Sequence, residues 1–224
     1  MARILNKFIP LDKKLSNGTG KLNTPLKSHT GSLRGRRKVF VAMSGGVDSS
    51  VAALLLKKQG YNAIGVFMRC FNLDGCAERD AEDARRVAEK LKIPFYVWDF
   101  EEEYKKKVVK YMVRGYKKGI TPNPDVMCNK EIKFGLFLEK ALEMEADYVA
   151  TGHYVHLQKS KILNPKSQTN PKSKIQNLKL LASHFSLFIA KDKNKDQSYF
   201  LWTLTQKQLK HCLFPIGGYL KSEV

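Results

Sequence analysis

The stretch Val39–Ser50 reads VFVAMSGGVDSS and joins a short apolar run to a glycine-containing turn. The five consecutive apolar residues at its start, Val39 to Met43, are typical of a parallel strand buried on both faces. After the turn, the residues from Asp48 to Gln59 favour a helix, and Gly60 is a common residue at a helix end. The stretch therefore predicts a strand, a tight turn and a helix, which together form the basic unit of an α/β protein.

The same alternation of strands and helices continues as far as Thr151. Further strands are expected at residues 61–68, 93–100 and 147–151, and further helices at residues 77–91, 101–118 and 130–145, with a Pro-bearing loop at residues 120–129. Strands that alternate with helices at this spacing are typical of a doubly wound parallel sheet. The sequence therefore predicts a Rossmann-like α/β fold.

Four segments are expected along the chain. Residues 1–37 show no sustained periodicity and are interpreted as a disordered basic leader, and residues 38–156 hold the α/β domain. Residues 157–186 include the near repeat NPKSQTNPKS, which predicts a low-complexity insert in the form of a loose hairpin or loop. Residues 187–224 continue the folded region, with a helix expected at residues 197–209, and we expect the chain to be truncated at its C-terminal end.

The net charge of +19 is concentrated in two of these segments. Residues 1–38 carry ten Lys or Arg against one acidic residue, and residues 157–186 carry six Lys and no acidic residue. Basic segments of this kind bind polyanions through their phosphates, which indicates an RNA or DNA partner. A solubilising basic tail without a specific partner explains the same charge equally well.

The cysteines and the hydropathy exclude several classes of protein. Four cysteines (Cys70, Cys76, Cys128 and Cys212) are too few for a disulfide scaffold, and no pair of them has the spacing of a metal site. A reducing cytoplasmic location fits this usage. No apolar run approaches the roughly 18 residues that span a bilayer, so no membrane partner is expected. The basic, acid-poor N-terminus also fits an organellar transit peptide, which stays open as an alternative.

The turn SGGVDSS has the composition of a phosphate-binding loop. Gly45 and Gly46 lack a Cβ, so their amides can approach a phosphate closely, and the amides of Val47 to Ser49 begin a helix whose N-terminus favours an anion. The hydroxyls of Ser44, Ser49 and Ser50 are further donors, and the Asp48 carboxylate is a candidate ligand for Mg²⁺ on the phosphates. The loop lacks the GK[ST] ending of a Walker loop, so a γ-phosphate site of that type is not predicted.

The string SGGVDS resembles the PP-loop of the N-type ATP pyrophosphatases, which have a HUP-type fold, cleave ATP between the α and β phosphates and adenylate an acceptor. Three further motifs narrow the resemblance: PNPDVMCNKEIKFG from Pro122, ATGHYV from Ala150 and KDQSYFL from Lys195. Their order and spacing resemble those of the tRNA-specific 2-thiouridylase family over about residues 38–155 and 187–224. The resemblance implies ATP-dependent 2-thiolation of the wobble uridine, position 34, of a tRNA, with Mg²⁺ as cofactor and a persulfide sulfur donor protein as a partner.

The resemblance also implies roles for particular residues. Cys128 would be the catalytic thiol, working with a persulfide on a second cysteine. The nucleotide would contact Ala42, Met43, Ser44, Gly45, Gly46, Val47, Asp48, Ser49, Met68 and Gly152. The tRNA would contact Asn123, Pro124, Asp125, Lys195, Asp196 and Gln197, so that residues 187–224 would begin the tRNA-binding part.

The roles of Cys128 and His153 stay open on physical grounds. Cys128 lies one residue before an expected helix start and is flanked by Lys130 and Lys133, a setting that lowers the pKa of a thiol, although a buried inert cysteine fits the spacing as well. His153 is interpreted either as a donor near the phosphates or as a packed histidine beside the sheet.

The sequence also departs from the family pattern. The family's second cysteine lies beyond the FPIGG string, and neither Cys70, Cys76 nor Cys212 matches it, although any of them would be a substitute. A disulfide bond is a further feature that the resemblance implies. The alternatives are another PP-loop adenylating enzyme, which would not need a cysteine after NPD, and an inactive ATP- or RNA-binding fragment.

Overall fold

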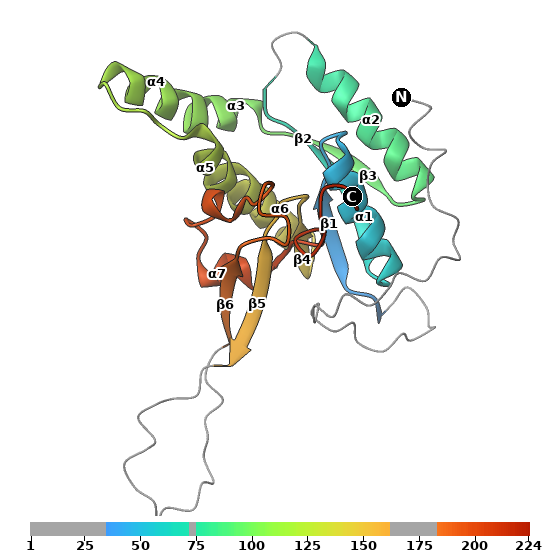
Figure 1. Ribbon diagram of the computed structural model, residues 1–224. Coiled ribbons are helices and arrows are strands. Elements are labelled where there is room, and N and C mark those ends of the chain that lie inside the picture. Colours follow the sequence, from blue (N-terminus) through green and yellow to red (C-terminus); the bar gives the residue numbers. More distant parts are fainter. Residues whose placement is uncertain (1–34, 72–74, 162–182) are drawn as a thin grey trace, which may run out of the picture.

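The computed structural model describes residues 35–71, 75–161 and 183–224. The rest of the expected leader and most of the expected insert lie outside these residues, and the expected domain boundaries stay a prediction. A five-stranded parallel sheet with the order β3-β2-β1-β4-β7 forms the centre of the molecule (Figure 1). Its strands are β1 (Lys38–Ala42), β2 (Asn62–Arg69), β3 (Phe95–Asp99), β4 (Tyr148–Ala150) and β7 (Cys212–Leu213). The doubly wound parallel fold is confirmed, and its first four strands lie where the apolar runs predicted them.

The strand β1 has an apolar side chain at every position after Lys38 because both faces of the sheet are covered. Val39 and Val41 pack with residues of α1 (Val47–Lys58) and α2 (Cys76–Lys90) in one buried cluster. Phe40 packs on the opposite face, in the cluster that contains the helices after β3. Alternate residues of one strand therefore supply two separate cores.

The helix α1 ends as its glycine predicted. Gly60 has a φ of +87°, the left-handed conformation in which a Cβ is disfavoured. Its N–H donates to the Lys57 carbonyl at 3.0 Å, and the Tyr61 N–H donates to the Leu56 carbonyl at 3.1 Å. These two hydrogen bonds satisfy backbone carbonyls in the last turn of α1, and the chain then continues into β2.

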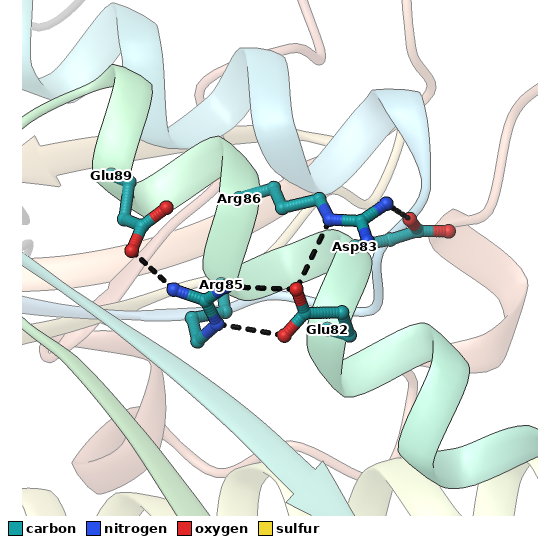
Figure 2. A network of polar contacts seen from close by, with 5 residues as sticks. All are labelled: Glu82, Asp83, Arg85, Arg86 and Glu89. Atoms are coloured by element: carbon teal, nitrogen blue, oxygen red, sulfur yellow. Dashed lines mark hydrogen bonds and ion pairs between the residues drawn. The ribbon is translucent and has the colours of Figure 1, made fainter.

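The solvent-facing side of α2 carries a network of ion pairs (Figure 2). Arg85 donates to Glu82 and Glu89, and Arg86 donates to Glu82 and lies 3.7 Å from Asp83. Hydrogen bonding to Arg85 lowers the pKa of Glu82 to about 2. These residues are three or four apart, so they support the exposed side of the helix while its alanines pack on the sheet.

Two long helical runs lie on the other side of the sheet, and the second of them packs on its face. The first consists of α3 (Glu101–Tyr104), the π-helical segment η3 (Lys105–Val109) and α4 (Lys110–Lys117), which agrees with the helix expected at residues 101–118. The second consists of α5 (Pro124–Cys128), the π-helical segment η4 (Asn129–Leu136) and α6 (Phe137–Glu143).

The start of the second run corrects the sequence-based expectation of a loop at residues 120–129. The helix begins at Pro124, not at Lys130, because Asn123 caps it: the Asn123 Oδ1 accepts the Val126 N–H at 3.1 Å. Proline at the first helical position loses no hydrogen bond, and its φ suits a helix. The two prolines favour a loop by composition, but the Asn-Pro-Asp string is a helix start.

The C-terminal part differs most from the expectation. The helix expected at residues 197–209 is wrong: only a 3₁₀ turn, Ser198–Phe200, and a short helix, α7 (Gln206–Leu209), form there. Leu201 is fully buried between them, and Thr205 begins α7 with a capping box, so the chain must turn before that residue. The chain then pairs Cys212 and Leu213 in parallel with Val149 and Ala150, a strand that the sequence did not predict.

An antiparallel hairpin projects from the domain between these parts (Figure 1). Its strands are β5 (His156–Lys161) and β6 (Ser183–Phe188), which pair from His156 with Phe188 to Lys161 with Ser183. The ends of the expected insert are therefore the two strands of a hairpin. In the described ranges, no helix has the length and apolar character needed to cross a membrane.

Candidate active site

A pocket of about 460 Å³ lies at the carboxyl ends of the strands, beside the point where the strand order reverses between β1 and β4. This switch point is where open α/β sheets bind their ligands. Nine of the residues predicted to be functional line the pocket. They are Ala42, Met43, Ser44, Asp48, Ser49, Met68, Cys128, Gly152 and Gln197. The fold therefore brings together residues that lie more than 150 positions apart in the chain.

The glycines of the site allow backbones to come into contact. Gly45 has a φ of +76°, and a Cβ there would lie 2.7 Å from the Asp80 carbonyl oxygen of α2. A Cβ on Gly152, in the segment after β4, would lie 2.7 Å from the Ser49 backbone nitrogen. The segment after β4 therefore lies directly against the first turn of α1, and larger residues do not fit at either position.

The hydroxyls of the loop mostly bond within it. The Ser49 Oγ accepts the Ser44 N–H at 3.1 Å and donates to the Gly46 carbonyl at 3.2 Å, and the Ser50 Oγ donates to the same carbonyl at 2.7 Å. In this part of the described chain, α1 begins after Gly46 with no side-chain cap. The first-turn amides of α1 are thus the donors that the loop presents to an anion.

Asp48 has two partners that the sequence analysis missed. Its Oδ1 accepts a hydrogen bond from the Tyr154 hydroxyl at 2.9 Å and from the Lys221 Nζ at 2.5 Å. The Lys221 N–H donates to the Asp192 Oδ2 at 2.8 Å, which fixes the C-terminal segment near the loop. Nothing in the local sequence around Lys221 identified it, because the contact spans 173 positions.

Asp48 is the one carboxylate of the loop that could hold a Mg²⁺ ion. Among the described residues no group of three or more His, Cys, Asp or Glu has the arrangement of a metal site. Mg²⁺ commonly uses only one or two carboxylates together with substrate phosphates and water, so the single Asp48 carboxylate fits that type of binding.

Cys128 lies in the pocket, but its environment differs from the expected one. It is the last residue of α5, about one turn after the helix start, and it is half-buried. Burial raises the pKa of its thiol above the ordinary value, Lys133 lowers it, and Asp125 raises it. The expected lowering by a helix N-terminus is therefore wrong. Of the two flanking lysines, Lys133 lines the pocket, whereas Lys130 pairs with Glu131 at 3.6 Å.

Two further cysteines, Cys70 and Cys76, line the same pocket. Burial and the neighbouring Cys128 raise the pKa of Cys70 to about 12. Cys212 lies in the core, where burial raises the pKa of its thiol, and its Sγ donates to the Gln208 carbonyl. All four cysteines are free, so the disulfide bond implied by the resemblance is not formed.

His153 is a packed histidine that also lines the pocket, and its role as a donor near the phosphates stays a prediction. The His153 ring packs between Phe134 and Phe214, and its Nδ1 lies 2.7 Å from the Thr151 Oγ1. Burial, with a contribution from Lys133, lowers its pKa to about 3. His153 is therefore a neutral hydrogen-bonding group near physiological pH and not a cation for phosphate.

The segments expected to contact tRNA divide into exposed and internally bonded residues. Asn123 uses its side chain as the helix cap, and Asp125 is exposed. Lys195 is exposed, but Asp196 accepts the Ala190 N–H at 2.8 Å, and Gln197 accepts the Tyr154 N–H at 3.0 Å. The side chains of Asp196 and Gln197 thus hold neighbouring segments in place.

The strand order, the glycine-containing loop after β1 and the pocket at the switch point define a Rossmann-like α/β protein of the PP-loop type. Residues 37–224 match the family described as "tRNA methyl transferase HUP domain". The chain therefore belongs to this family.

The chain is similar to proteins named tRNA-specific 2-thiouridylase MnmA. It is 47% identical over 189 residues to the protein of Karelsulcia muelleri, a match that covers 84% of this chain and 45% of the relative. It is 50% identical over 195 residues to the protein of Flavobacterium johnsoniae, with the same coverage of 84% and 45%. The chain thus spans about half the length of the curated relatives it matches. A solved structure titled "predicted subunit of tRNA methyltransferase", from Methanocaldococcus jannaschii, has a TM-score of 0.45 at 17% sequence identity. The match covers 83% of this chain and 71% of the Methanocaldococcus chain.

Proposed function

We propose that this chain carries the ATP-dependent uridine-activating site of a tRNA 2-thiouridylase. The observation that supports this most directly is that Cys128 and the PP-loop residues Ser44, Asp48 and Ser49 line one pocket. A general nucleotide-binding protein would not need a thiol there. A 2-thiouridylase needs both the nucleotide and the thiol close to C2 of the uracil, because C2 is activated by ATP and then receives the sulfur. The relatives named as 2-thiouridylases support the same proposal.

The first step would activate a carbonyl oxygen that is otherwise a poor leaving group. The uracil O2 attacks the α-phosphorus of ATP, the bond to the β-phosphate oxygen breaks, and pyrophosphate leaves. The amides at the start of α1 would stabilise the negative charge of the phosphates, and the close backbone contacts at Gly45 and Gly152 would hold the loop in position. Asp48 would hold Mg²⁺, which would supply further charge neutralisation. The tRNA contacts proposed for Asn123–Asp125 and Lys195 would hold the uridine out of its stack.

The second step would replace the oxygen by sulfur. A persulfide sulfur from a donor protein, passed through a second cysteine, attacks C2 of the adenylated base. The C2–O bond breaks and AMP leaves with the original oxygen. The Cys128 thiolate, which the neighbouring Lys133 cation favours, would then attack the inner sulfur of the persulfide. The S–S bond breaks, the outer sulfur stays on C2 as the thiocarbonyl, and Cys128 and the second cysteine are oxidised to a disulfide. A cytoplasmic location, where thiols stay reduced, suits this chemistry.

The two steps can be tested separately. We expect ATP–pyrophosphate exchange that depends on unmodified tRNA, and we expect the Cys128→Ser variant to retain that exchange while losing 2-thiouridine, measured by mass spectrometry of digested tRNA with a persulfide donor present. Cys76→Ser is measured beside it, because Cys76 is an exposed cysteine of the same pocket. Retained 2-thiouridine in Cys76→Ser shows that the loss is specific to Cys128, and a loss in both variants assigns the second-cysteine role to Cys76. Unchanged 2-thiouridine formation by Cys128→Ser would contradict the proposal. Exchange with a different acceptor would indicate another PP-loop enzyme, and no exchange under any condition would indicate an inactive fragment.

A further inference from the structure

Two large aromatic side chains project into solvent shortly after Lys195–Gln197, here called the KDQ segment. Tyr199 is 60% exposed and Trp202 is 74% exposed. The Tyr199 ring lies against the Phe200 ring, with centroids 4.1 Å apart and an angle of 35° between the planes. Solvent-exposed aromatic residues that lie this close in sequence commonly mark a binding surface.

The backbone that carries these residues is held rigidly beside the pocket. The Gln197 N–H donates to the Tyr154 carbonyl at 2.9 Å, and the Gln197 side chain accepts the Tyr154 N–H in return. The Asn129 Nδ2, one residue after Cys128, donates to the Phe200 carbonyl at 3.4 Å. The 3₁₀ turn is thus bonded both to the segment after β4 and to the helix that carries the pocket thiol.

The adjoining chemistry favours a single-stranded nucleic acid. Exposed Lys193 and Lys195 precede the aromatic residues, whereas the nearby Lys191 is paired with Glu223 at 3.0 Å. Proteins that bind unpaired strands combine aromatic rings, on which bases stack, with cations that follow the phosphates. The core of a protein–protein interface is instead depleted of lysine. Charge complementarity therefore selects RNA over a protein as the occupant.

We propose that Tyr199 and Trp202 form a stacking surface for an unpaired base of the RNA substrate, next to the base that enters the pocket. The inference rests on the proposed function and gives the KDQ segment a different role from the one expected. Asp196 and Gln197 hold the turn in place through internal hydrogen bonds, and the aromatic side chains make the contact with the bases.

Trp202 provides its own probe, because the only other tryptophan, Trp98, is 5% exposed. The experiment titrates the whole chain with a 17-nucleotide hairpin that has a seven-nucleotide loop, and with a fully paired RNA duplex of equal length. We expect the hairpin to quench the Trp202 fluorescence and to protect it from iodide, and the duplex to do neither. The Trp202→Phe variant supplies the background signal of Trp98.

The affinity for the hairpin gives the second measurement. Tyr199→Ala and Trp202→Ala should each weaken binding by about 5-fold to 150-fold, and Trp202→Phe should restore most of the affinity because phenylalanine also stacks. Tyr116→Ala is the matched control: Tyr116 is 58% exposed on α4, which extends away from the sheet (Figure 1). Circular dichroism confirms that each variant is folded.

The inference is overturned if the hairpin leaves the Trp202 emission unchanged, if the duplex quenches it equally, or if the alanine variants bind like Tyr116→Ala. Unchanged Trp202 emission would indicate that the aromatic surface binds a protein partner instead of RNA. Pyrophosphate exchange is measured on the same variants. If Tyr199→Ala and Trp202→Ala keep the full dependence of pyrophosphate exchange on tRNA, the stacking surface is overturned but the proposed function is not. The ATP site would then respond to tRNA without the two aromatic side chains.

Discussion

The contact between Gly152 and the first turn of α1 predicts a large effect for the smallest substitution. In Gly152→Ala, the new Cβ would lie 2.7 Å from the Ser49 nitrogen, 2.8 Å from the Asp48 carbonyl carbon and 3.0 Å from the Ser49 Cα. Ordinary contacts begin near 3.4 Å, so the two backbones must separate by about 0.7 Å. All three atoms belong to the backbone, so no side chain can rotate away. Overpacking of this kind costs about 1–3 kcal/mol.

This cost should appear both in stability and in nucleotide binding. For a chain of this size, 1 kcal/mol corresponds to about 2–4 °C in Tm, so Gly152→Ala should unfold about 2–12 °C lower. If the strain is relieved by moving the loop, the affinity for ATP falls by about 5-fold to 150-fold. Differential scanning calorimetry and isothermal titration calorimetry with ATP measure the two effects.

Gly218→Ala is the control, because a Cβ at Gly218 meets no atom within 4 Å in the described structure. We expect its Tm and its affinity for ATP to stay those of the unmodified chain. If Gly152→Ala behaves like Gly218→Ala in both measurements, the segment after β4 does not lie against the loop in solution, and the account of the pocket fails.

Two further predictions concern charges in the site. Lys221→Met should lower the free energy of unfolding by no more than about 1 kcal/mol, because its pair with Asp48 is more than a third exposed and is screened by solvent; a chemical denaturation curve that shows a loss above about 2 kcal/mol would contradict this. Alkylation of Cys128 by iodoacetamide, measured by peptide mass spectrometry, should accelerate about tenfold per pH unit between pH 7 and 9. The raised pKa keeps most of the Cys128 side chain in the thiol form over this range, so the fraction of reactive thiolate grows with each pH unit. Lys133→Met should make the alkylation slower than in the unmodified chain at each pH, because Lys133 lowers the pKa of Cys128. An alkylation rate that reaches a plateau below pH 8 would contradict the raised pKa.

The strands and helices that the sequence predicted correctly are those whose signal is local. The apolar run of β1 and the glycine after α1 each determine the backbone through their own residues, and the structure has the elements there. The short strand Cys212–Leu213 carries no such pattern and exists because the edge of β4 is available to pair with it. A two-residue strand defined by a distant partner is not visible in a window of sequence.

The helix start at Pro124 shows a different kind of failure. The signal was present, since Asn-Pro-Asp places a capping residue before a proline suited to the first turn. Proline is also a turn residue, so the same string predicts a loop, and a loop there would place Cys128 just before the helix start. Burial of the thiol, which opposes its ionisation, is a tertiary property and could not be read from the neighbouring lysines.

Tyr154 shows why the site is best understood as one unit. Its hydroxyl donates to Asp48 in the loop, and its backbone exchanges two hydrogen bonds with Gln197 at the base of the aromatic turn. A shift of the loop upon nucleotide binding would therefore act on the turn Ser198–Phe200 through one buried residue, Tyr154. RNA bound at the turn would act on the loop in the reverse direction. Thermodynamic linkage requires the two effects to be equal. Dependence of pyrophosphate exchange on tRNA would then have a physical route through Tyr154, in addition to the supply of the acceptor base.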